Sequence, residues 1–194
     1  VSALTFPIGV GLAVTAQPLV ATLYGGAYAQ SAPILAALAV YTLVYSASFH
    51  AGDVFKAIGR PGVLTAINAG KLVVLVGPIW WAAGHSALMV AWTLLGVEAL
   101  HFVVRMAILR KLTGVGWLSV AGALWRPAAA AVPMGLVLVG LGHVTDQLAA
   151  PLELAVLAVA GVVLYCLLLR FTAPQLFDTG YQMVRRRLAR SAVK

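Results

Sequence analysis

Long, unbroken apolar runs alternate with short polar connections along the whole chain. About 20 mostly apolar residues suffice for one helical membrane crossing. Six runs meet that length: 2–23, 33–54, 63–83, 87–108, 122–141 and 152–171. The apolar residues are consecutive and do not alternate with polar ones, which favours helices over barrel strands. The pattern therefore predicts an all-α fold, a polytopic transmembrane helix bundle with six spans.

Composition supports a membrane protein. The 194 residues are 62% hydrophobic and 9% charged, whereas soluble domains have about 25% charged residues. The net charge of +8 comes from basic residues that cluster between apolar runs, which indicates membrane topology and not a nucleic-acid partner. The sequence begins "VSALTFPIGVG", without Met or a basic leader, so we expect it to be part of a longer membrane protein.

Basic residues occupy every second connection. The connections at 24–32, 84–86 and 142–151 contain no Lys or Arg. The other connections and the tail after residue 171 contain Lys56, Arg60, Arg110, Lys111, Arg185, Arg186, Arg187, Arg190 and Lys194. Because basic loops stay on the cytoplasmic side, this alternation predicts that both ends of the chain are cytoplasmic.

The tail, residues 173–194, has a helical pattern of its own. Phe177, Tyr181, Val184 and Leu188 recur at helical spacing, and arginines occupy other positions. This spacing predicts a basic amphipathic helix on the anionic inner leaflet, with the lipid contacts made by Arg185, Arg186, Arg187 and Arg190. The alternative is a disordered tail that serves only topology.

Motifs of enzymes are absent from the sequence. It contains no P-loop, HExxH or GxSxG motif. The single cysteine, Cys166, cannot form a disulfide framework or a thiolate metal site. We therefore expect no catalytic residue, no metal and no cofactor, and a protein that is not an enzyme.

Charges inside the predicted spans are the clearest candidates for a site, because a charge in lipid is costly. Glu98 lies near the middle of the fourth span, with His101 and Arg105 on the same helical face. Lys71 lies in the third span at about the depth of Glu98, and Arg105 is near enough to the inner surface to snorkel. In a structural interpretation, Lys71 and Glu98 pair and lock two helices. In a functional one, Lys71 or Arg105 attracts an anionic substrate, and Glu98 or His101 senses ions or protons.

The stretch "FHAGDVFKAIGRPG", residues 49–62, concentrates charge between two apolar runs. Asp53 is one helical turn from Lys56, which predicts a local ion pair. Gly59 and Pro61 are typical of the end of one helix and the start of the next. We interpret this stretch as a cytoplasmic helical hairpin and not as a catalytic loop.

Two segments resemble a known family. In "PLVATLYGGAYAQSAPILAALAVYTLVYSASF", residues 18–49, an apolar span ends at an aromatic–glycine turn and a Pro-initiated helix follows. In "DVFKAIGRPGVLTAIN", residues 53–68, a helix ends in Ala-x-Gly-Arg. Together they resemble the polysaccharide exporters and O-antigen flippases of lipopolysaccharide biosynthesis. This family belongs to the multidrug/oligosaccharidyl-lipid/polysaccharide superfamily.

The resemblance covers residues 1–115 and implies a two-lobe transporter of the multidrug-extruder type. Residues 1–115 would form four helices of the second lobe, residues 116–172 two further helices, and residues 173–194 the tail. The implied activity is the flipping of undecaprenyl-diphosphate-linked oligosaccharide across the bacterial inner membrane by alternating access. Polysaccharide-assembly proteins are possible partners. The apolar fifth and sixth spans would suit the polyprenyl tail, although ordinary lipid-facing helices are the simpler interpretation.

No family motif fixes a substrate residue, so the assignments come from charge and depth. Lys71 is the first candidate for the diphosphate and Arg105 the second. One alternative function is a cation-coupled multidrug antiporter, for which Glu98 would be the coupling acid. A membrane-embedded polysaccharide polymerase is less favoured, because no connection exceeds about a dozen residues.

Overall fold

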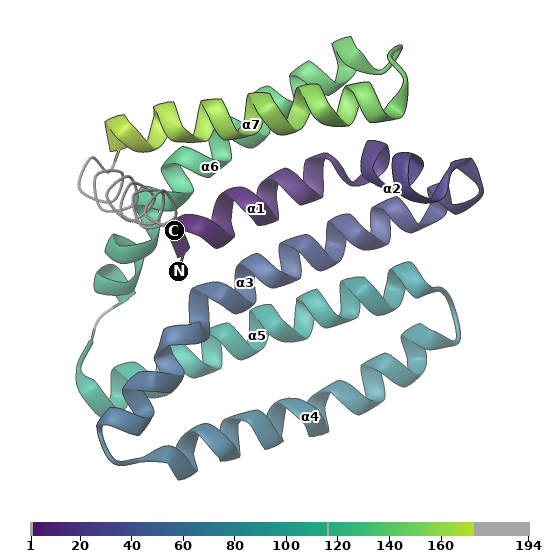
Figure 1. Ribbon diagram of the computed structural model, residues 1–194. Helices are drawn as coiled ribbons and strands as arrows, with labels where there is room; N and C mark the ends of the chain where they lie inside the picture. The colour runs from purple at the N-terminus through teal and green to yellow at the C-terminus, as the bar shows by residue number, and fades with distance from the viewer. Residues whose placement is uncertain (1, 116, 173–194) are drawn as a thin grey trace, which may run out of the picture.

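The computed structural model describes residues 2–115 and 117–172, and all the regular structure in these ranges is helical (Figure 1). The elements are α1 Ser2–Val14, α2 Ala16–Tyr24, the 3-10 helix η1 Gly26–Ser31, α3 Ala32–Ala57, α4 Pro61–Ala83, α5 Ala87–Thr113, α6 Trp117–Thr145 and α7 Ala150–Thr172. Within the described ranges, five helices are long and apolar enough to cross a membrane, and the bent pair α1–α2 makes a sixth if it counts as one span. The predicted all-helical, multi-pass class is confirmed. The amphipathic tail predicted for residues 173–194 lies outside the described residues.

The first predicted span is not one straight helix. The chain bends by 69° between α1 and α2. Pro18 has no N–H to donate to the carbonyl of Val14, and its ring would clash with that carbonyl in a straight helix. Thr15, at the break, turns its hydroxyl back onto the carbonyl of Gly11 at 2.8 Å. The predicted span over residues 2–23 is therefore present as a bent pair of helices, and it makes one span if the pair crosses the membrane together.

The helices form an extended row in which α4, α5, α3 and α1 lie in that order, and α6 and α7 pack on the far side of α1 (Figure 1). Successive membrane-length helices run in opposite directions. The start of α1, the α3–α4 turn, the end of α5 and the end of α7 all lie at one end of the bundle. The alternation expected from the loops is present, and which end faces the cytoplasm stays a prediction.

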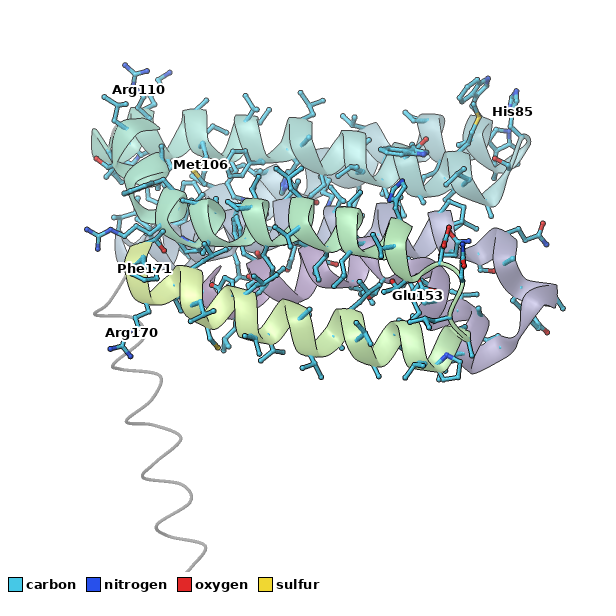
Figure 2. All side chains as sticks on the ribbon, turned by 90° about the horizontal axis from the view of Figure 1, so that it is seen from above. His85, Met106, Arg110, Glu153, Arg170 and Phe171 are labelled. Carbon is cyan, nitrogen blue, oxygen red and sulfur yellow. The ribbon has the colours of Figure 1, made fainter. Side chains whose placement is uncertain are left out.

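Charge is separated between the two ends of the bundle. Figure 2 shows Arg110 and Arg170 at one end and His85 and Glu153 at the other. The basic turn between α3 and α4 lies at the Arg110 end. We call this the basic end of the bundle. The basic connections on which the positive-inside rule relies therefore lie together at one end of the folded protein.

Two larger apolar cores hold the row together, and a smaller one joins α2 to α3 around Val20. The first joins α1, α6 and α7 around Met134, Leu138 and Leu157. The second joins α3, α4 and α5 around Phe55, which is completely buried. Small residues at the contacts allow the helices to approach closely, as helices in lipid generally do.

The turn between α3 and α4 forms as predicted. The backbone N–H of Arg60 donates to the carbonyl of Phe55 at 2.9 Å, and that of Gly59 donates to Lys56 at 3.0 Å. This is the Schellman arrangement that ends helices, and it places Gly59 at a φ of 71°, a value that glycine adopts without strain. Asp53 and Lys56 form the expected pair at 3.8 Å on the exposed surface.

Candidate functional site

Six polar side chains meet between α3, α4 and α5, inside otherwise apolar helices. We call them the polar cluster: Ser48, Asn68, Lys71, Glu98, His101 and Arg105. The three members from α5 recur at helical spacing, so they share one face of that helix. That face packs against α3 and α4, which leaves Glu98 at 0%, His101 at 5% and Arg105 at 6% exposure.

An ion pair joins α4 to α5 at the centre of the cluster. The ammonium of Lys71 donates to Oε2 of Glu98, and Nδ1 of His101 lies 3.6 Å from Oε1 of the same carboxylate. The Lys71 ammonium also lies 5.7 Å from the centre of the Tyr41 ring on α3, within the range of a cation–π contact. Lys71 and Glu98 are therefore in contact, as their similar depth in the two spans allowed.

Arg105 does not snorkel, contrary to the expectation from its position. Its guanidinium donates through Nη1 to the carbonyl and the hydroxyl of Ser48 at 3.2 and 3.1 Å. Through Nη2 it donates to Oδ1 of Asn68 at 3.2 Å, and the ring of His101 lies 3.4 Å away. The neighbouring helices supply acceptors at the depth of Arg105 itself, so the side chain has no need to reach the membrane surface.

The cluster has more positive than negative charge. Lys71 and Arg105 contribute two positive charges and Glu98 one negative charge, while the acceptors around Arg105 are neutral groups. Within the described residues, Nε of Arg105 and Oε1 of Glu98 are buried without a hydrogen-bond partner. A buried charge without an opposite charge is costly, so this cluster would be stabilised by an additional anion.

Lys71 is the cation of the cluster that can be reached from outside. It lines a groove of about 480 Å³ between α4 and α5, together with His101 and apolar side chains. The Lys71 side chain is 17% exposed, whereas the Glu98 side chain is 0% exposed. Arg105 does not line this groove. The geometry thus separates Lys71, which can contact a ligand, from Arg105, which holds three helices together.

Four members of the cluster, Lys71, Glu98, His101 and Arg105, were predicted from the sequence, but nothing in it indicated Ser48. A serine in an apolar span gives no signal, because small polar residues are common in transmembrane helices. The only indication of a contact with Arg105 would have been that Ser48 lies at a similar depth in the membrane. Using that indication requires knowing that α3 and α5 are neighbours.

In the described part of the chain, no group of three or more His, Cys, Asp or Glu side chains could hold a metal ion. Cys166 is exposed on α7 and takes no part in the cluster. Comparisons with protein-family models, with curated proteins and with solved structures found no match. The fold and the site define the class: a multi-pass helical membrane protein with a buried, net-positive polar cluster.

Proposed function

We propose that this chain belongs to a transporter that flips undecaprenyl-diphosphate-linked oligosaccharide across the bacterial inner membrane by alternating access. The observation that carries the proposal is the excess positive charge of the polar cluster in the membrane interior. Intramembrane charges of this kind face substrate pathways or partners. The diphosphate of the lipid-linked substrate would supply the negative charge that the cluster lacks.

The two cations have different roles in this proposal. Lys71 contacts the diphosphate, because it lines the α4–α5 groove and its side chain is partly exposed. Arg105 is a positioning residue, because its donors are used on Ser48 of α3 and Asn68 of α4. Glu98 holds Lys71 in place until the substrate arrives.

Features outside the cluster also fit a transporter. The break between α1 and α2 resembles the discontinuous helices of secondary transporters, which bend or line substrate pathways. An apolar groove of about 310 Å³ between α1, α6 and α7 would suit part of the polyprenyl tail. With the basic end in the cytoplasm, both ends of the chain are cytoplasmic.

A flipping assay with the full-length protein tests the proposal. Vesicles would contain a fluorescent undecaprenyl-diphosphate-linked sugar, and an added lectin or reductant would report its exposure. The variant Lys71→Met/Glu98→Gln removes both charges of the pair, so neither residue is left as a charge without its partner. We expect at least a tenfold lower flipping rate at normal protein level. The matched control, Lys56→Met/Asp53→Asn, removes an exposed pair and should flip normally. Normal flipping by the first variant would rule out Lys71 as a substrate contact.

A cation-coupled multidrug antiporter is the second candidate, and one observation favours it. The carboxylate of Glu98 is completely buried, and its Oε1 lies 3.6 Å from His101 without accepting a hydrogen bond. Acidic residues inside membrane spans mark ion and proton pathways in transporters. In that case Glu98→Gln would abolish drug-stimulated proton movement, and the vesicles would show no flipping of the lipid-linked sugar.

A further inference from the structure

The groove between α4 and α5 is regular along its length. Its lining residues recur at short, regular intervals on both helices: Val63, Ile67, Gly70 and Val74 on α4, and Val97, His101, Val104 and Ile108 on α5. Each interval is about one helical turn. The groove therefore follows the two helices from their basic end toward the middle of the bundle.

The length of the groove matches one leaflet of a bilayer. From Val63 to Val74 the helix rises about 16 Å at 1.5 Å per residue. The hydrocarbon core of a bilayer is about 30 Å thick, so one leaflet contributes about 15 Å. The walls are apolar over this distance, and Lys71 and His101 are the polar residues near the inner end of the groove.

Two basic residues lie just beyond the groove's lining residues in the chain, at the basic end of the bundle. Arg60 directly precedes α4, three residues before Val63, and Lys111 is in the last turn of α5, three residues after Ile108. Both residues are exposed. Neither forms an ion pair with any residue in the ranges that the structure describes. An anionic headgroup could therefore be bound between them without displacing a carboxylate.

Gly70 keeps the middle of the groove open. A Cβ built on Gly70 would meet no atom within 4 Å. A larger side chain at this position would therefore enter the groove and would not collide with the protein. Gly77, on the same helix, is equally open but does not line the groove.

We propose that the α4–α5 groove binds one acyl chain of an anionic phospholipid from the leaflet at the basic end, with the lipid phosphate between Arg60 and Lys111. The apolar walls bury the chain along its length, and the two cations select the charge of the headgroup. The lipid chain would share the groove with Lys71, the proposed substrate contact. Lipid retention is measured without transport, so the test does not depend on the proposed flippase activity.

Native mass spectrometry of the full-length protein, released from detergent with phosphatidylglycerol or phosphatidylcholine, tests the site. We expect the protein to retain one phosphatidylglycerol at least fivefold better than phosphatidylcholine. Gly70→Leu should lose this retention by filling the groove, and Gly77→Leu should keep it. Arg60→Gln/Lys111→Gln should lose the preference for phosphatidylglycerol. Lys56→Gln/Arg110→Gln removes the same charge from the same end of the bundle and should keep the preference.

Three results would overturn the proposal. The first is equal retention of both lipids by the wild type, because the headgroup would then not be recognised. The second is full retention by Gly70→Leu, because the lipid would then bind elsewhere. The third is displacement of phosphatidylglycerol by an equimolar polyprenyl phosphate, because the groove would then belong to the isoprenoid chain.

Discussion

Lys71 of α4 and Glu98 of α5 form an ion pair between two antiparallel helices, and the two partners differ in exposure. The Glu98 side chain is completely buried, whereas that of Lys71 reaches the α4–α5 groove. The same pair can therefore lock two helices and present a cation to a ligand. Experiments on this pair must separate stability from binding.

Removing one partner of the pair should cost more stability than removing both. Lys71→Met leaves the Glu98 carboxylate buried and unpaired, so we expect a loss of about 3 kcal/mol in the free energy of unfolding. Lys71→Met/Glu98→Gln should recover most of this loss. Titration of the protein in micelles with a denaturing detergent measures both values. Equal losses in the single and double variants would mean that leaving the Glu98 carboxylate buried and unpaired costs nothing.

The charge-swapped variant provides a second test of the same pair. Lys71→Glu/Glu98→Lys reverses the pair without leaving a charge alone, so it should be more stable than either single change. Recovered stability without recovered flipping would assign Lys71 a role in substrate binding as well. If neither stability nor flipping recovers, the neighbouring side chains require the cation on α4 and the carboxylate on α5. The Tyr41 ring beside Lys71 and His101 beside Glu98 are such neighbours.

Arg105→Lys should destabilise the protein although it conserves the charge. The guanidinium of Arg105 contacts Ser48 on α3 and Asn68 on α4 at the same time, through two separate nitrogens. The single ammonium of a lysine cannot make both contacts in this geometry. We expect a loss of about 2 kcal/mol, since hydrogen bonds from a charged group are lost. The control is Arg110→Lys on the exposed surface of the same helix. A harmless Arg105→Lys would show that one contact suffices.

Gly135 on α6 should tolerate no side chain. A Cβ at this position would lie 2.5 Å from Cγ1 of Val10 on α1. Valine in a helix has one strongly preferred rotamer, so it cannot turn away cheaply. Gly135→Ala should therefore cost about 1–3 kcal/mol through overpacking. Gly140→Ala on the same helix meets open space and should be neutral. Equal stability of the two variants would mean that α1 and α6 can separate without cost.

Pro18→Ala should straighten the bend between α1 and α2. The new N–H can donate to the carbonyl of Val14 and so continue the helix. Spin labels at Leu4 and Leu23 would then move apart by about 5 Å, from the helical rise per residue and the observed bend. Pro7→Ala, inside α1, is the control. An unchanged distance would show that the packing of α2 against α7 holds the bend.

Cysteine accessibility tests the orientation in the membrane. In a background with Cys166→Ala, a cysteine at Ser86 should react with an impermeant reagent added outside intact cells. A cysteine at Gly62 should react only after the membrane is opened. This follows from the positive-inside rule and the basic end of the bundle. The reverse labelling pattern would invert the predicted topology.

The sequence specified the number of spans and the alternation of their ends. Apolar runs of membrane length and the placement of Lys and Arg are local signals, and the observed helices α3 to α7 include the predicted ranges apart from small differences at their ends. The turn at residues 49–62 was also predictable, because Gly59, Pro61 and the Asp53–Lys56 pair act within a few residues. The bend at Pro18 has a local cause, but Pro7 and Pro78 lie inside helices without ending them, so the sequence could not locate the break.

By itself the sequence determined a helical membrane protein with alternating spans and a few costly charges in the membrane interior. Only the tertiary structure decided how those charges are satisfied. It buried Arg105 against Ser48 and Asn68, paired Lys71 with Glu98, and brought Lys71 and His101 to one groove. The physical reason is that hydropathy acts along the chain, whereas compensation of a buried charge depends on which helices are neighbours. In lipid, packing and polar contacts between helices decide which helices become neighbours. The sequence of a single span does not show these contacts.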